Sequence, residues 1–432
     1  MRTEHLKRRG RLQSSALFLL VTAALFAAPA PSSGQRAPTR PEEVGLSSER
    51  LERLSAALSD YVKDGRLAGS VALVARRGRI AYLEAFGRRD IESDAPMASD
   101  TIFRIASQSK AVVSVAVMIL QEEGRLLLSD PVGKYIPEFM KTKVAVPSGR
   151  DGYTVVDARR PITIRDLLTH TSGISYGGGP ASDRWSTAGI SGWYFADRDE
   201  PIRVTVARMA ALPFDAQPGE RWIYGFSVDI LGAVVEAASG EPLDAFLRGR
   251  IFEPLGMRDT HFYLPPAKQD RLSVVYSATE AGLERAVDPG GMVGQGAYLT
   301  GPRKSFSGGA GLLSTAPDYA RFLQMLLNGG ELDGRRILGR KTVELMTTDH
   351  LDGKAFGPGQ GFGLGFSVVL DAGARGVPGS IGEFGWGGAY HSTYWVDPQE
   401  ELVVVYLSQL IPAGDIDDHA KLRALIYQAI AD

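Results

Sequence analysis

Segments typical of β-strands lie at both ends of this chain, and helical segments lie between them. Two apolar runs flank a turn at Arg77-Gly78, and three strand-like segments occur late in the chain; the five runs are 70–75, 80–86, 362–370, 390–396 and 402–407. Strands this far apart can share one sheet only if the intervening chain leaves the sheet and returns. We therefore expect an α+β fold, with one sheet built from both ends, helices flanking it and a mainly helical lobe inserted.

Helix signals fill the rest of the pattern. A helix begins at Ser47 and ends before Gly65, and a long buried helix starts at Ser107 and ends before Gly124. Further helices are expected at 164–170, 227–239, 316–328 and 417–431, and loops at 172–200. Within one domain over 36–432, the sheet lobe should comprise about 44–112 and 236–432, and the helical lobe about 113–235.

Composition limits the function. The 432 residues carry 48 Lys and Arg against 50 Asp and Glu, a net charge of −2, which offers no basic surface for nucleic acid. There is no cysteine, so disulfides, zinc–thiolate sites and cysteine nucleophiles are excluded. The six histidines are scattered and lack the His-Glu-x-x-His spacing of a helical zinc site. We expect no metal site, although spacing alone leaves a carboxylate-held magnesium open.

The first 34 residues have the layout of a signal peptide. A positive stretch at 7–11 precedes an apolar run at 16–28, which is too short to span a bilayer comfortably. Ala28-Pro29-Ala30 offers small residues for cleavage, which is expected between 28 and 35. Arg8-Arg9 leaves open whether export is general or twin-arginine. The mature protein is predicted to be periplasmic or secreted, without a stable membrane span and with its oligomeric state open.

Ser107 and Lys110 form a Ser-x-x-Lys pattern at the start of the long buried helix. Side chains three residues apart share one helix face. A hydroxyl is a poor nucleophile at neutral pH, and an amine whose pKa is lowered by desolvation can take its proton. The helix N-terminus also directs backbone N–H groups toward a developing oxyanion. The alternative interpretation, a helix cap followed by a surface lysine, is common, but we interpret Ser107 as a nucleophile.

The surrounding residues support this interpretation. Phe103-Arg104-Ile105-Ala106-Ser107-Gln108-Ser109-Lys110 resembles the nucleophile segment of the serine β-lactamase and penicillin-binding-protein superfamily. The mature chain as a whole resembles its class C-like branch, the family VIII carboxylesterases, with further matching segments at 128–132, 164–173, 254–257 and 309–315. This resemblance implies a β-lactamase/transpeptidase-like fold with an antiparallel sheet, a small-molecule ester substrate with a short acyl chain, and no cofactor.

The resemblance also assigns a role to Tyr224, which falls at the family's tyrosine motif. Tyr224 would relay the proton from Ser107 to the leaving group. A phenol can do this only when nearby positive charge stabilises its anion, and Lys110 could supply that charge. Without the resemblance, a core aromatic residue would be the default interpretation.

The third segment of the implied site is Gly385-Trp386-Gly387-Gly388-Ala389. Its glycines allow the backbone to approach a substrate closely, so Trp386, Gly387 and Gly388 are candidate substrate-binding residues. By resemblance, the amides of Ser107 and Ala389 form the oxyanion hole. Taken alone, Trp-Gly-Gly is only a turn.

Two positions depart from the lactam-processing relatives. A cation that holds the substrate carboxylate begins the third motif there, and Trp386 takes its place here. The tyrosine motif there usually ends in Asn, and Phe226 takes its place here. Both changes remove polar recognition of a peptide-like acid and add apolar surface. They favour neutral esters.

The remaining candidates have competing interpretations. Asp229 also matches the esterase branch, so it is a candidate for orienting the site or binding substrate, or else a helix-start carboxylate. His391 is a candidate substrate-binding residue, or else an exposed strand histidine. Ser175 lies in a Gly-x-Ser-x-Gly motif, but that motif requires a preceding strand, and a short helix precedes it here, so Ser175 is rejected as a nucleophile. His170 is expected to be a turn residue that bonds backbone. The aromatic residues Trp185, Trp193 and Tyr194 are expected either to line an acyl pocket or to cover the edge of a core.

Three functions follow. The first is an exported serine carboxylesterase that hydrolyses short-chain acyl esters through a Ser107 acyl-enzyme. The second is a β-lactamase or a D-alanyl-D-alanine carboxypeptidase or aminopeptidase with the same mechanism, disfavoured by Trp386 and Phe226. The third is a receptor that is acylated without turnover, disfavoured because Ser107, Lys110 and Tyr224 are all present.

Overall fold

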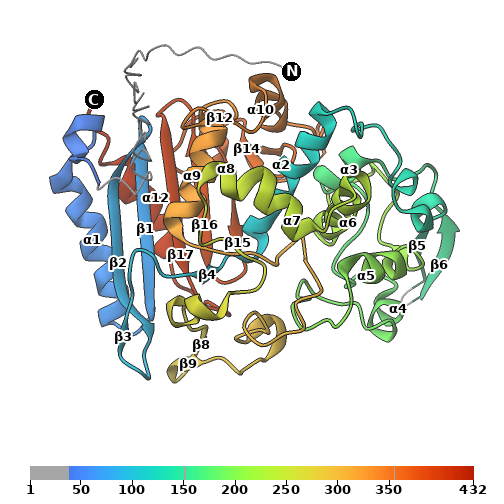
Figure 1. Ribbon diagram of the computed structural model, residues 1–432, viewed down its shortest axis with the longest axis horizontal. Helices are drawn as coiled ribbons and strands as arrows, with labels where there is room; N and C mark the ends of the chain where they lie inside the picture. The colour runs from blue at the N-terminus through green and yellow to red at the C-terminus, as the bar shows by residue number, and fades with distance from the viewer. Residues whose placement is uncertain (1–37, 150–151, 355) are drawn as a thin grey trace, which may run out of the picture. The chain divides into compact units, whose positions relative to one another are not determined.

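An eight-stranded antiparallel sheet joins the two ends of the chain (Figure 1). The computed structural model describes residues 38–149, 152–354 and 356–432. The strand order is β13-β14-β15-β16-β17-β1-β2-β3. The strands are β1 Gly69–Arg76, β2 Arg79–Asp90, β3 Ala95–Pro96, β13 Gln360–Phe362, β14 Ser367–Val369, β15 Phe384–Gly388, β16 Ser392–Asp397 and β17 Leu402–Ser408. Since β17 pairs with β1 along its length, the expected sheet from both ends is confirmed.

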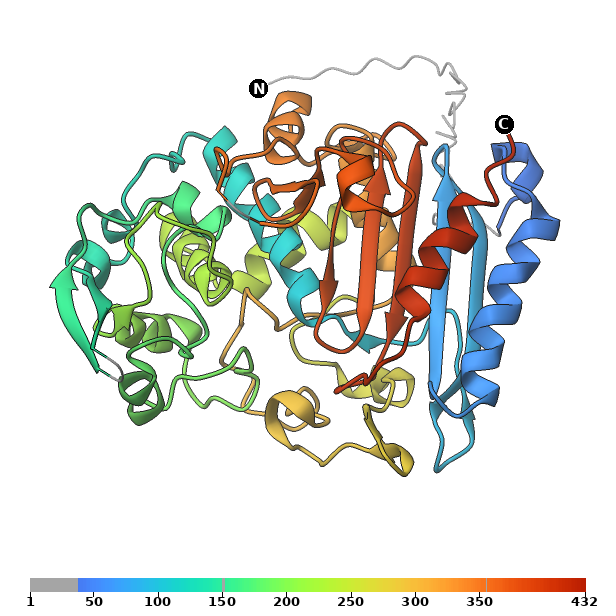
Figure 2. The same cartoon turned by 180° about the vertical axis from the view of Figure 1, so that it is seen from behind.

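Strand β17 explains why helices cover both faces of the sheet. All of its residues are buried, and its side chains alternate between two apolar cores. Helices α2 Ser109–Glu122 and α9 Ala316–Leu327 belong to one core, and α1 Ser48–Lys63 and α12 Asp418–Tyr427 to the other (Figures 1 and 2). A strand buried on both faces needs apolar residues at nearly every position, as the Leu-Val-Val-Val-Tyr-Leu run provides.

The chain between α2 and the end of α6 forms a mainly helical region, coloured teal to green in Figure 1. Its helices are α3 Ile164–Leu168, α4 Ser182–Thr187, α5 Ile202–Met209 and α6 Ser227–Ser239. Helix α6 packs against α2, α3 and α5 and so ties this region to the helix that follows Ser107. A small sheet, in the order β6 Gly152–Asp157, β5 Lys143–Ser148 and β7 Pro213–Phe214, was not predicted.

Shorter elements complete the fold. The helices are α7 Leu243–Leu247, α8 Glu253–Leu255, α10 Arg340–Met346 and α11 Ala372–Arg375. The strands are β4 Phe103–Arg104, β8 Tyr276–Thr279, β9 Gly282–Arg285, β10 Leu313–Ser314, β11 Glu331–Leu332 and β12 Arg335–Arg336. The pairs β4–β10, β8–β9 and β11–β12 each form a two-stranded sheet.

Several expected elements differ from the structure. The run 362–370 was expected as one strand, but the chain reverses between β13 and β14 at Gly365, whose φ is +102°. The helix expected over 164–170 ends at Leu168, because His170 adopts a φ of +55°. The loops expected over 172–200 contain α4.

The predicted signal peptide and its cleavage site lie outside the described residues. In the part of the chain that the structure describes, no helix combines the length and the apolar character that crossing a bilayer requires.

Glu383, directly before β15, ties that strand to α12. Its side chain is only 2% exposed. It accepts hydrogen bonds from Arg375 (2.8 Å), from Arg423 (2.7 Å to each oxygen) and from the Tyr427 hydroxyl (2.8 Å). Burial alone would raise the pKa of Glu383, but the two guanidinium groups outweigh burial and lower it.

Replacing Glu383 by alanine should lower the free energy of unfolding by about 3–5 kcal/mol, because two largely buried guanidinium groups lose their counter-charge. Urea unfolding at neutral pH measures this loss. The pKa of Glu383 is lower in the folded state than the ordinary value of about 4.3 for a glutamate. The stabilisation by Glu383 is therefore complete above about pH 5 and is lost as the pH falls through this lowered pKa. The control Glu344→Ala breaks exposed ion pairs and should change stability by less than about 0.5 kcal/mol. Equal losses in the two variants would contradict this account.

Candidate active site

Ser107 lies in a tight turn between β4 and α2. The turn is a 3-10 helix, Ala106–Gln108, and Ala106 enters it with a φ of +43°, which non-glycine residues rarely adopt. The segment that contains Leu312 holds the turn on both sides. The Ile105 amide donates to the Leu312 carbonyl (3.1 Å), and the Leu312 amide donates to Ser109 Oγ (3.0 Å). Ser107 therefore precedes α2 instead of belonging to its first turn.

The Lys110 ammonium is buried behind Ser107 and has three hydrogen-bond acceptors. Its Nζ lies 2.8 Å from the Gly309 carbonyl oxygen, 3.0 Å from the Tyr176 hydroxyl and 3.2 Å from Ser107 Oγ. A protonated lysine has three N–H donors and no acceptor, so this set satisfies the charged form completely.

The charge state of Lys110 corrects an expectation from the sequence. Burial lowers the pKa of Lys110, as expected, but the Tyr176 and Tyr224 hydroxyls and the Asp229 carboxylate outweigh burial and raise it above its ordinary value. Lys110 is therefore an ammonium at neutral pH. It can orient and polarise its neighbours, and the base that takes the Ser107 proton has to be another group.

Asp229 supplies the negative charge behind Lys110. Its side chain is fully buried near the start of α6, and Oδ1 accepts from Ser307 Oγ (2.6 Å) and from the Gly309 amide (3.0 Å). The Gly309 peptide thus donates to Asp229 and accepts from Lys110. Burial raises the pKa of Asp229, and the charge of Lys110 opposes that rise. This placement corrects the prediction of a substrate contact, because Asp229 positions Lys110 from behind.

Two tyrosines flank the ammonium. Lys110 Nζ lies 4.6 Å from the centre of the Tyr224 ring, and the Tyr224 hydroxyl accepts a hydrogen bond from the Trp386 indole N–H (3.0 Å). Tyr176 makes the direct hydrogen bond to Lys110, and its ring packs edge-on against Tyr224. Sequence reasoning missed Tyr176, which follows Ser175 in the rejected Gly-x-Ser-x-Gly motif. No spacing to Ser107 or Lys110 could have identified it.

A cavity of about 610 Å³ opens in front of Ser107. The predicted site residues that line it are Ser107, Tyr224, Trp386, Gly387, Gly388, Ala389 and His391. Tyr176 and Trp193 line it as well. Phe226 does not: it is fully buried and packs against Trp185, so it shapes the wall from behind and the predicted substrate contact is wrong.

The two residues rejected as catalytic groups lie outside this cavity. Ser175 accepts a hydrogen bond from the Gly177 amide and does not line the cavity. His170 is fully buried, its carbonyl accepts from the Ile223 amide (2.8 Å), and its ring packs on Tyr224. Burial and the nearby Lys110 charge lower the pKa of His170 well below its ordinary value, so the ring is neutral.

This fold and this Ser–Lys site define a serine hydrolase. The β-lactamase family matches residues 54–428, and the chain belongs to that family. Protein Rv1367c of Mycobacterium tuberculosis is 37% identical, over 85% of this chain and 92% of that protein. Esterase EstB of Burkholderia gladioli is 35% identical, over 84% of this chain and 91% of EstB. The solved structure of EstCE1, a hydrolase with promiscuous acyltransferase activity, is 30% identical with a TM-score of 0.75, over 88% of this chain and 99% of that one.

Replacing Asp229 by asparagine should make Ser107 lose reactivity at a lower pH. Asparagine keeps an oxygen for Ser307 and Gly309 but removes a charge that raises the pKa of Lys110. The pH dependence of Ser107 labelling by a fluorophosphonate probe measures this, and we expect the alkaline decline to move down by about one pH unit. The control Asp244→Asn lies outside the cavity and should leave the profile unchanged. If the profile of Asp229→Asn is unaltered, the Asp229 carboxylate does not stabilise the Lys110 ammonium.

Proposed function

We propose that this protein is an exported serine carboxylesterase that hydrolyses short-chain acyl esters through an acyl-enzyme on Ser107. The observation that carries the proposal is the position of Trp386. Its indole N–H bonds the Tyr224 hydroxyl at 3.0 Å, so an aromatic ring stands where a lactam-processing relative would hold a substrate carboxylate. The names of two relatives, Esterase EstB and the hydrolase EstCE1, support the same reaction class.

The charges that line the cavity also favour a neutral substrate. Arg375 and Arg423 both contribute to its lining, but both are paired with the buried Glu383. Trp386 packs against Phe362 (5.4 Å between ring centres) and Phe356 (6.1 Å), and these rings hold the indole group in place from outside the cavity lining. An anionic substrate would have to compete with Glu383 for these two guanidinium groups and would lose hydration, whereas a neutral ester loses little.

The proposed reaction uses the groups that surround Ser107 and line the cavity. Its Oγ attacks the ester carbonyl carbon while its proton passes to the phenolate form of Tyr224. The Lys110 ammonium and the Trp386 N–H stabilise that phenolate. The carbonyl oxygen becomes an oxyanion held by the amides of Ser107 and Ala389. When the carbon–oxygen bond to the alcohol breaks, Tyr224 returns the proton to the leaving oxygen, and the acyl group stays on Ser107.

Deacylation repeats these steps with water. A water molecule attacks the acyl carbon and gives a proton to Tyr224, the bond to Ser107 Oγ breaks, and the proton returns to Ser107 as the acid leaves. The Lys110 ammonium remains protonated throughout. Its role is to hold the Ser107 oxygen and to stabilise negative charge on its neighbours.

Ser107→Ala should abolish turnover of a short-chain nitrophenyl ester while the protein stays folded, because no other group in the proposed mechanism can carry the acyl chain. The assay compares this ester with a chromogenic cephalosporin and a D-Ala-D-Ala peptide. We expect ester turnover to exceed both others by at least about tenfold. Ester hydrolysis that survives in Ser107→Ala would refute the mechanism. Faster lactam or peptide turnover would move the substrate class to that of the second candidate, and a stable adduct without release would indicate an acylated receptor.

The two tyrosines should differ in their effect on kcat. Tyr224→Phe removes the proton relay and should lower kcat by about 10²–10⁴-fold. Tyr176→Phe removes one of three acceptors around Lys110 and should lower kcat by only about tenfold, with KM changed by less than about threefold. Steady-state kinetics on the nitrophenyl ester measure both. If Tyr176→Phe is the more damaging variant, the two roles must be exchanged.

A further inference from the structure

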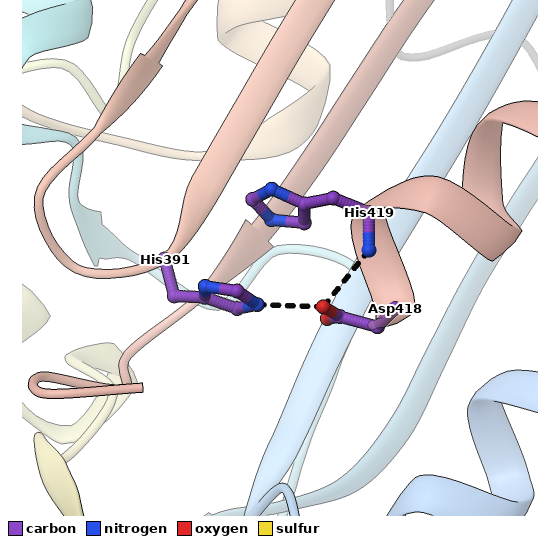
Figure 3. A group of neighbouring side chains, drawn as sticks. All are labelled: His391, Asp418 and His419. Carbon is purple, nitrogen blue, oxygen red and sulfur yellow. Dashed lines mark hydrogen bonds and ion pairs between the residues drawn. The ribbon is translucent and has the colours of Figure 1, made fainter. Parts of the chain in front are cut away.

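Two histidines and a carboxylate meet between the β15–β16 turn and the start of α12 (Figure 3). His391 comes from the turn, and Asp418 and His419 begin the helix. One ligating atom from each of the three residues lies within 4.8 Å of the others. Nothing in the mechanism uses Asp418 or His419, and the predicted substrate role of His391 does not explain why the other two side chains gather around it.

The carboxylate at the centre has no permanent counter-charge. Asp418 is fully buried, and its Oδ1 accepts from His391 Nε2 (2.6 Å) and from the His419 amide (2.9 Å). Oδ2 accepts from the Tyr406 hydroxyl (2.7 Å). Among the described residues, no lysine or arginine forms an ion pair with it. His391 therefore stands in the place where a counter-cation would lie beside this carboxylate.

The second imidazole has a free nitrogen. Nε2 of His419 is buried and has no hydrogen-bond partner in the described structure, although its ring stacks on His391 with 4.1 Å between ring centres. An unpaired buried nitrogen in the same cluster as a buried carboxylate that has no lysine or arginine partner among the described residues is an arrangement that a metal ion satisfies.

From this juxtaposition of His391, Asp418 and His419 we infer a binding site for a divalent transition-metal ion of the zinc class. Two imidazoles and one carboxylate are a donor set that suits Zn²⁺ and does not suit Mg²⁺ or Ca²⁺. The ligating atoms of a tetrahedral zinc site stand about 3.3 Å apart. Side-chain rotations that bring the three atoms from within 4.8 Å to that spacing would let the ion replace the proton between His391 and Asp418.

The surroundings suit such a site. The Tyr406 hydroxyl and the His419 amide orient Asp418 in the way that outer groups orient metal ligands. The His391 backbone has a φ of +60°, and its carbonyl is held by the Ser408 hydroxyl. Both histidines line the cavity that contains Ser107, which gives an ion access from solvent and leaves a coordination position open. The scattered histidines of the sequence predicted no metal site, because His391 and Asp418 are 27 residues apart.

Zinc titration of tag-free protein, stripped with EDTA and followed by calorimetry, tests the inference. We expect one equivalent of Zn²⁺, and affinity reduced at least tenfold in His419→Ala and in Asp418→Asn. His350→Ala, which removes a histidine outside the cluster, should bind as the parent does. Binding that is absent, or equally strong in His419→Ala, would overturn the site.

Two further measurements separate a ligand role from a structural one. Co²⁺ in place of Zn²⁺ should give a visible absorption band in the parent protein and in His350→Ala but not in His419→Ala. Zn²⁺ should also raise the melting temperature of the parent protein and of His350→Ala, but not that of His419→Ala. If metal-free His419→Ala melts at the same temperature as the metal-free parent but is not stabilised by Zn²⁺, the result supports the site. If Zn²⁺ raises the melting temperature of His419→Ala as much as that of the parent, the result contradicts the site. All these readouts are independent of ester turnover.

Discussion

The buried ammonium of Lys110 is the constraint on which the rest of the site depends. A lysine charge inside a protein is stable only when every N–H has an acceptor and a counter-charge stands nearby. Here the acceptors are Ser107, Tyr176 and Gly309, and the counter-charge is Asp229. These groups come from segments far apart in the sequence. The sheet core, the helical region and the 307–315 segment therefore have to be correctly assembled before the nucleophile has its environment.

Strand β15 carries the second constraint, which is one of space. A Cβ atom on Gly388 would stand 2.5 Å from the Ile105 carbonyl oxygen and 2.5 Å from Ser392 Oγ. Only glycine allows the strand to approach the Ser107 turn this closely, and Ala389 follows directly in the proposed oxyanion hole. Glu383 fixes the other end of the strand to α12 through two guanidinium groups. Strand β15 is thus held at both ends, and the turn that follows it contributes His391 to the inferred metal site.

Trp386 connects the chemistry of the site with its specificity. Its indole N–H bonds Tyr224, and the resemblance predicts that Trp386 takes the place of the cation of the lactam-processing relatives. A cation there would attract a substrate carboxylate, whereas the indole group donates to the phenol and leaves an apolar wall. Lys110 then supplies the positive charge beside Tyr224. One position would therefore link the stabilisation of Tyr224 to the proposed preference for a neutral substrate.

The sheet from both ends and the long buried helix could be predicted from the sequence, because apolar periodicity is a local property. Motif spacing singled out Ser107 and Lys110, and the resemblance added Tyr224 and Trp386, but the start of the helix was predicted two residues too early, since α2 begins at Ser109. The charge of Lys110 could not be predicted, because its pKa depends on burial and on hydroxyl and carboxylate groups from distant segments. Only the tertiary structure brought Tyr176 to Lys110, moved Asp229 and Phe226 behind the cavity wall and placed His391 against Asp418. Such contacts between distant segments leave no periodic signal in a sequence, since they arise only when packing brings the segments together.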